Sequence, residues 1–120
     1  MEMQMKELGK QWITSEKEYR EGEVFVYRQK FTASQVKKAV FYGTALGVYE
    51  AELNGVKIGR QMFAPGFSYY PRRVLYQTHE VTELLREGEN TLTVYLGQGW
   101  YCGRFLCENQ TQIYGEQPAV

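Results

Sequence analysis

The sequence contains 120 residues, of which 43% are apolar, a length that allows one hydrophobic core and is too short for two domains. Its 14 basic and 14 acidic side chains cancel, so no net field would attract nucleic acid or an anionic membrane. Residues 1–10 lack the apolar run of a secretory signal, and no window approaches the roughly 20 apolar residues of a membrane span. We therefore expect one cytoplasmic domain that binds neither nucleic acid nor membranes.

Two strands are predicted in the first third of the chain. Val24–Phe31 is rich in β-branched and aromatic residues, and a period of two places its aromatic rings on one side. Ala39–Thr44 follows as a second strand, in which Gly43 indicates a bulge or a close backbone approach. The polar segment 15–23 is expected to be a loop, with Trp12 docking the N-terminus onto the core.

A β-hairpin is the clearest local prediction. In Val48–Ile58, apolar side chains alternate with Glu50 and Glu52, so one face of the hairpin is expected to be buried and the other solvated. Asn54-Gly55 supplies the positive φ values that a type I′ turn requires.

The segment after the hairpin is expected to be a long ordered loop. Gly59–Arg73 has two prolines, four aromatic rings and no periodicity, and a loop of this length is usually functional or part of an interface. Val74–Thr78 is predicted as a short strand. The apolar spacing in Val81–Leu85 predicts one or two helical turns, with Thr82 as the cap and Gly88 as the stop.

The last clear strand is Thr91–Leu96, which ends at two glycines around Gln98. An apolar run begins at 117–120, which indicates that the chain is cut through a domain. Several short strands with turn signals and only a token helix favour an all-β class, an antiparallel sandwich or barrel. We expect a single sandwich domain with an N-terminal extension, a core and a tail, at residues 1–23, 24–107 and 108–120.

Catalytic and metal chemistry find little support in the sequence. Cys102 and Cys107 are expected to be free thiols, and His79 is a lone imidazole that we interpret as a loop residue. Two carboxyls that act together as acid and base lie about 5 to 10 Å apart around the bond they cleave. Glu50 and Glu52 have about that spacing, but we expect them on an open, solvated strand face. No catalytic residue, metal site or cofactor is therefore predicted.

A series of motifs resembles a known family. The chain carries YEAELNGVKIG, then APGFSYYPRRVLYQT, then EVTELLREGENTLTVYLGQGWYCGR. Asn-Gly turns alone are common, but in this order the motifs resemble the N-terminal domain of bacterial α-L-rhamnosidases, over a match from about Trp12 to Arg104.

This resemblance implies a jelly-roll β-sandwich of galactose-binding-like topology. It also implies a downstream (α/α)₆ barrel as the partner domain, in which family members place their catalytic carboxylates. The family domain continues with further strands past the position of Val120. We therefore expect an incomplete sandwich with an open sheet edge, which could pair with another chain.

Two aromatic and arginine-rich segments are the candidate contact sites. Aromatic rings stack on the apolar faces of sugars, and arginines bind their hydroxyls. The alternative interpretation is that these side chains pack loop on loop or dock the catalytic domain, with arginines stacked on tyrosines. The candidates for carbohydrate binding or interdomain docking are Phe67, Tyr69, Tyr70, Arg72, Trp100, Tyr101 and Arg104.

Calcium-assisted sugar binding, which some related rhamnose-binding modules use, is not expected here. Calcium sites need several oxygen ligands, including carboxylates. No acidic residue lies between Gly55 and His79, and Arg60-Gln61 and Ser68-Tyr69 stand where relatives often have aspartates.

The functional prediction is a non-catalytic accessory or substrate-recognition domain of an α-L-rhamnosidase-like glycoside hydrolase, which cleaves terminal α-L-rhamnosyl linkages. Its expected partners are the catalytic barrel and a rhamnosylated glycan. Two alternatives are an autonomous carbohydrate-binding module and a structural spacer that forms homo-oligomers through its open sheet edge.

Overall fold

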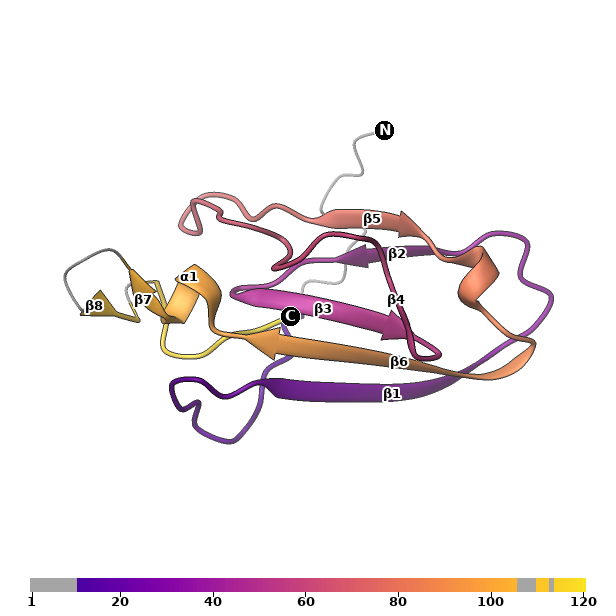
Figure 1. The fold of residues 1–120 in the computed structure, drawn as a ribbon, viewed down its shortest axis with the longest axis horizontal. Helices are drawn as coiled ribbons and strands as arrows, with labels where there is room; N and C mark the ends of the chain where they lie inside the picture. The colour runs from indigo at the N-terminus through magenta and orange to yellow at the C-terminus, as the bar shows by residue number, and fades with distance from the viewer. Residues whose placement is uncertain (1–10, 106–109, 113) are drawn as a thin grey trace.

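The computed structural model describes residues 11–105, 110–112 and 114–120, and these are built almost entirely from antiparallel strands (Figure 1). The main sheet has four strands in the order β1 (Phe25–Ala33), β6 (Gly88–Gly97), β3 (Val48–Leu53) and β4 (Val56–Lys57). Two-stranded sheets are formed by β2 (Val40–Gly43) with β5 (Gln77–Glu80) and by β7 (Arg104–Phe105) with β8 (Gln110–Thr111). The helical elements are the 3₁₀ turn η1 (Thr82–Leu84) and α1 (Gly99–Cys102). The predicted all-β, antiparallel class is confirmed.

The core lies between the main sheet and the β2–β5 pair, which are drawn as separate layers in Figure 1. Tyr49 of β3 joins the two layers: its ring centroid lies 6.5 Å from that of Phe41 in β2, and its hydroxyl donates to Gln77 Oε1 of β5 at 3.0 Å. Burial raises the pKa of Tyr49 to about 12. The buried core residues are Ala45, Tyr49, Ala51, Leu53, Ile58, Ala64, Val81, Val94 and Leu96.

The predicted hairpin is confirmed. Alternate residues of β3 are buried, and the Asn54-Gly55 turn has the positive φ values of 53° and 80°. Asn54 also does more than turn the chain, because its side-chain amide donates to Asn90 Oδ1 at 2.8 Å. The close approach predicted at Gly43 is also present, but it is to the Tyr49 side chain: a Cβ on Gly43 would lie 2.5 Å from the Tyr49 hydroxyl.

The strand predicted at Val74–Thr78 is displaced along the chain. It begins at Gln77, which pairs with Gly43, the last residue of β2, and it continues to Glu80. Earlier residues have no strand partner because β2 has ended. His79 is therefore a strand residue rather than a loop residue, and its ring packs so closely on Gly59 that a Cβ there would meet it at 2.4 Å.

The predicted helical segment is a single 3₁₀ turn, and its cap was predicted wrongly. Val81 occupies the N-cap position, and no side chain caps it. The Thr82 hydroxyl instead accepts a hydrogen bond from the Ala39 N–H at 3.0 Å, which ties the turn to the start of β2. Gly88, with φ of 89°, begins β6.

The N-terminal segment is held by its backbone and not by its tryptophan. Trp12 is 46% exposed, which contradicts the predicted docking. Ile13 exchanges two backbone hydrogen bonds with Val120, at 2.7 and 3.0 Å, and Tyr19 is buried. Ala119 in turn bridges to Leu46, so residues from both ends of the chain lie against the core. The division at residues 23 and 107 remains a prediction.

Candidate functional site

An aromatic cluster lies where the long loop meets α1, at the end of the main sheet opposite the Asn54-Gly55 turn (Figure 1). Four of its five rings come from the two predicted segments, and Tyr70 is central, with its ring centroid 5.1 Å from that of Tyr101. Phe67 contacts both Tyr70 at 6.0 Å and Trp100 at 6.4 Å, with the rings edge to face. Tyr114 completes the cluster at 5.1 Å from Tyr70. We call these five residues the aromatic cluster.

Two members of the cluster have mainly a packing role. Tyr70 and Tyr101 are partly buried, and burial raises the pKa of both hydroxyls. A Cβ on Gly115 would lie 2.4 Å from the Tyr101 hydroxyl, so the glycine makes room for this ring. Edge-to-face ring pairs contribute stability beyond the area they bury. The inner half of the cluster therefore holds the two loops together.

The outer half of the cluster remains accessible. Phe67 is 47% exposed and Trp100 is 42% exposed, and the neighbouring Tyr69 is 56% exposed. The Tyr69 carbonyl oxygen accepts hydrogen bonds from the N–H groups of Arg72 and Arg73, which shapes the loop as a tight turn. We call Phe67, Tyr69 and Trp100 the aromatic rim. Arg72 is exposed beside this rim.

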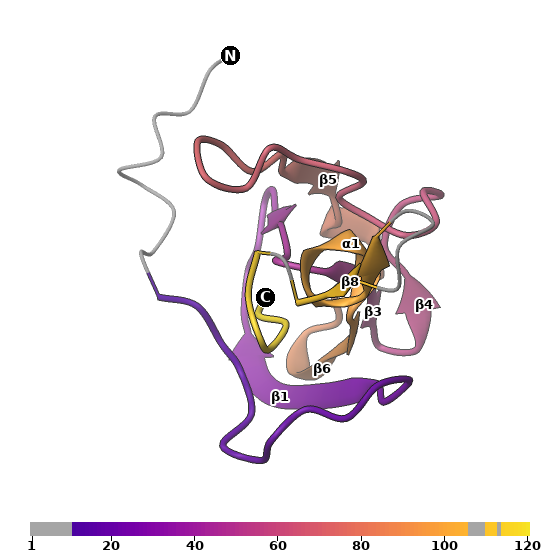
Figure 2. The ribbon, with the colours of Figure 1, turned by 90° about the vertical axis from the view of Figure 1, so that its left-hand side faces the viewer.

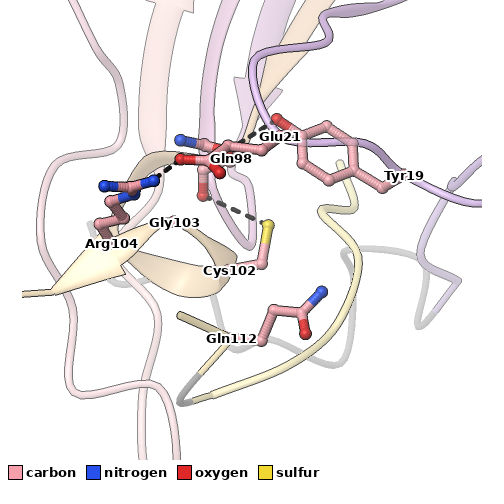
Figure 3. Close-up of a pocket in the computed structure, with 7 residues that line it drawn as sticks. All are labelled: Tyr19, Glu21, Gln98, Cys102, Gly103, Arg104 and Gln112. Carbon is pink, nitrogen blue, oxygen red and sulfur yellow. Dashed lines mark hydrogen bonds and ion pairs between the residues drawn. The ribbon is translucent and has the colours of Figure 1, made fainter. Parts of the chain in front are cut away.

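Arg104 is the predicted site residue that belongs elsewhere. Its Nε donates to Glu21 Oε1 at 2.8 Å, and both residues line a pocket of about 210 Å³ (Figure 3). This pocket, next to α1, is lined by Tyr19, Glu21, Gln98, Cys102, Gly103, Arg104 and Gln112. One acid and one base face each other there, so the pocket has a polar lining with little net charge.

The wall of the pocket is fixed by hydrogen bonds around Gln98. The Tyr19 hydroxyl donates to the Glu23 carbonyl oxygen at 3.0 Å and lies 3.1 Å from Gln98 Oε1. The Cys102 thiol lies 3.7 Å from the Gln98 carbonyl oxygen, and burial raises the pKa of the thiol to about 11. A thiol with such a pKa is protonated near neutral pH and is a poor nucleophile. Cys102 is free, as predicted, and Cys107 lies outside the described residues.

The two hairpin carboxylates each bind a side chain of their own sheet. Glu50 accepts a hydrogen bond from Lys57 Nζ at 3.0 Å, and Glu52 accepts one from the Tyr95 hydroxyl at 3.3 Å. Both lie on the face of β3 opposite the core and are partly exposed. A shallow hollow of about 160 Å³ beside Glu50 is lined mostly by apolar residues. Within the described ranges, no cluster of three or more metal-ligating side chains is present.

Sequence reasoning missed three functional candidates. Tyr114 lies in a polar tail, and Tyr19 and Glu21 lie in a polar lead-in, so none belongs to a periodic pattern. Only the folded chain brings them against residues about 40 to 80 positions away.

No helix in the described part of the chain has the length and apolar character to cross a lipid bilayer.

Comparison with known proteins places this geometry in a family. Residues 34–120 match the model of the α-L-rhamnosidase N-terminal domain. An α-L-rhamnosidase of Streptomyces avermitilis is 48% identical over 86 residues, which cover 72% of this chain and 8% of that protein. One from Formosa agariphila is 35% identical over 72 residues, 60% of this chain and 8% of that protein. The chain thus spans less than a tenth of the length of these relatives.

Solved structures agree with the sequence matches. The native α-L-rhamnosidase of Aspergillus terreus superposes with a TM-score of 0.83 at 32% identity, covering 90% of this chain and 13% of that one. The S. avermitilis enzyme, solved in complex with L-rhamnose, gives a TM-score of 0.74 at 44% identity over 78% of this chain and 9% of that one. The chain therefore belongs to the family of α-L-rhamnosidase N-terminal domains.

Proposed function

We propose that this chain is a non-catalytic accessory domain of a glycoside hydrolase that cleaves terminal α-L-rhamnosyl linkages. The aromatic rim is the observation that carries the proposal. Exposed apolar groups that gather in one place mark interaction sites, and aromatic residues are enriched in the buried centres of interfaces. In this proposal, the rim docks the catalytic region of the enzyme, for which the family resemblance implies an (α/α)₆ barrel.

The arrangement of the aromatic cluster favours docking over independent sugar binding. Of the rim rings, Phe67 packs against Tyr70 and Trp100 packs against Phe67, and Tyr70 itself packs on Tyr101 and Tyr114. A surface that is already ordered loses little conformational entropy when it is covered. The described carboxylates on the hairpin are bound by Lys57 and Tyr95, which supports a role without catalysis.

A chimeric enzyme would test the docking role. This chain replaces the matching segment of the S. avermitilis α-L-rhamnosidase, and Phe67→Ala with Trp100→Ala is compared with Val56→Ala, an equally exposed apolar residue on the distant hairpin. We expect the rim variant to lower the melting temperature of the chimera by about 5 °C or more and the control to change it little. Equal effects of the two variants would contradict docking through the rim.

An autonomous carbohydrate-binding module is the second candidate. It is favoured by the polar pocket at Glu21 and Arg104 and by the L-rhamnose complex of the S. avermitilis relative. Tryptophan emission of the isolated chain, in a Trp12→Phe variant that leaves Trp100 as the reporter, would be followed during addition of L-rhamnose. Saturable quenching supports the module, whereas a flat trace supports the docking role.

Catalysis is tested separately. We expect the isolated chain not to hydrolyse nitrophenyl α-L-rhamnoside. Turnover by the pure chain that Glu50→Gln abolishes would overturn the proposal, because it would place a catalytic carboxylate on the hairpin.

A further inference from the structure

Among the described residues, the nine-residue strand β1 lies at the edge of the main sheet and has β6 as its one strand partner (Figure 2). Hydrogen bonds elsewhere in the sheet show which backbone groups of β1 have no partner in the sheet. The Ile58 N–H donates to the Ala51 carbonyl oxygen and the Asn54 N–H to that of Thr91, both at 2.8 Å. In an antiparallel ladder, alternate residues bond to opposite neighbours. Even-numbered residues of β3 therefore bond toward β6, and odd-numbered residues of β6 bond toward β3.

The same alternation extends to β1. The even-numbered residues of β6 bond toward β1, where Leu96, Val94 and Leu92 lie opposite Phe25, Tyr27 and Gln29. The intervening residues direct their N–H and C=O groups away from the sheet. These outward residues are Val26, Arg28, Lys30 and Thr32.

One contact in the structure agrees with this assignment. The Gln29 side-chain amide donates to the Lys30 carbonyl oxygen at 2.9 Å, as expected for a carbonyl that no strand covers. The four outward residues are all exposed, and their side chains share the face opposite the core. Arg28 and Lys30 place two basic groups in the middle of this edge. Lys30 Nζ forms an ion pair with Glu89 Oε1 of β6 at 3.1 Å, and a pair this exposed contributes little stability.

The charges argue against a second copy of the chain on this edge. In antiparallel self-pairing, outward residues lie opposite outward residues. The three most overlapped registers place Arg28 opposite Lys30, Arg28 opposite Arg28, or Lys30 opposite Lys30. Like charges directly opposite each other destabilise a strand pair, and basic side chains are a common protection of edge strands.

We propose that the β1 edge binds an extended segment of another polypeptide that carries acidic side chains opposite Arg28 and Lys30. The segment adds a fifth strand, with main-chain hydrogen bonds for affinity and the acidic residues for selection. This surface is separate from the aromatic rim, and its binding of a peptide segment would be a function in addition to the accessory role proposed above.

A labelled peptide would test the proposal. The probe is an end-capped heptapeptide with glutamate at its third and fifth positions and threonine or valine elsewhere, followed by fluorescence anisotropy with the full chain. The matched control has lysine at the same two positions. We expect the glutamate peptide to bind about tenfold more tightly than the lysine peptide, because two cross-strand charge pairs change sign.

Two variants separate the charges from the backbone. The double variant Arg28→Glu, Lys30→Glu should reverse the preference between the peptides. Val26→Pro removes an outward N–H without changing charge, and should weaken binding of the glutamate peptide while the far-ultraviolet circular dichroism stays native. Equal affinity for both peptides, absence of binding, or an unaffected Val26→Pro variant would overturn the proposal.

Sedimentation equilibrium tests the argument against a second copy. The wild-type chain and the double variant should each be monomeric, whereas their mixture should form a heterodimer, because glutamates then face Arg28 and Lys30. Self-association of the wild-type chain that Val26→Pro abolishes would show that a second copy is the occupant and overturn the proposal.

Discussion

The two ends of the main sheet are stabilised by different kinds of interaction. We call the end with the Asn54-Gly55 turn the turn end and the end with the aromatic cluster the loop end. At the turn end, the buried Asn90 amide donates to the carbonyl oxygens of Arg86 and Gly88 and accepts from the Arg86 N–H and the Asn54 amide, all within 2.9 Å. At the loop end, the aromatic cluster is joined by ring contacts between 5.1 and 6.4 Å. Directional hydrogen bonds specify one closed geometry, whereas ring packing leaves exposed faces. The turn end therefore contributes mainly to the stability of the fold, and the loop end presents an exposed aromatic surface.

The largest effect is expected at the turn end. Asn90→Ala removes all four hydrogen bonds of a buried amide and leaves the groups it paired without partners. We expect a loss of about 3 kcal/mol or more in the free energy of unfolding, measured by urea denaturation. Exposed Gln112→Ala is the control. A loss below about 1 kcal/mol would mean that hydrogen bonds do not dominate this end.

At the loop end, Tyr101→Ala should have an intermediate effect. The ring contacts Tyr70 and lies over Gly115 but is only partly buried. We expect a loss of about 2 kcal/mol, by the same denaturation experiment. Tyr101→Phe keeps the ring and should lose less than half of this. If the two variants were equally unstable, the hydroxyl and not ring packing would hold the loops.

A pH effect should also arise at the loop end. Burial raises the pKa of Cys102 to about 11, from an ordinary value of 9.0, so folding favours the protonated thiol. The stabilisation is complete below the unfolded pKa and is lost as pH rises through the folded pKa. Between about pH 8 and pH 11 the free energy of unfolding should fall by about 1 to 2 kcal/mol more in the wild type than in Cys102→Ala. Parallel pH profiles would contradict burial of this thiol.

The smallest stability effect is expected at the aromatic rim. Trp100→Ala removes a ring that is 42% exposed and contacts Phe67. We expect a change below about 1 kcal/mol in the isolated chain, by thermal denaturation. A loss as large as that of Tyr101→Ala would show that the rim is part of the core and not an exposed surface.

The sequence alone predicted those features of the fold that depend on a local pattern of residues. The alternation in β3 and β6 predicted their core faces, and Asn54-Gly55 predicted its turn, because side-chain period and positive φ are local properties. Loop-on-loop packing was one of the two interpretations of the aromatic segments, and Phe67 contacts Trp100. The displacement of β5 and the bond of Thr82 to Ala39 in place of a cap were not predictable, since both depend on where β2 begins and ends.

Only the tertiary structure decided how distant segments combine. Arg104 was predicted with the aromatic residues, but it pairs with Glu21, 83 positions away, and Tyr114 joins the rings instead. Asn54, predicted only as a turn residue, and Asn90, which lies in a separate motif, share one hydrogen bond. Such contacts arise because the fold brings together segments that are far apart in the sequence. Periodicity predicts which face of a strand a residue lies on, but not which distant residue it contacts.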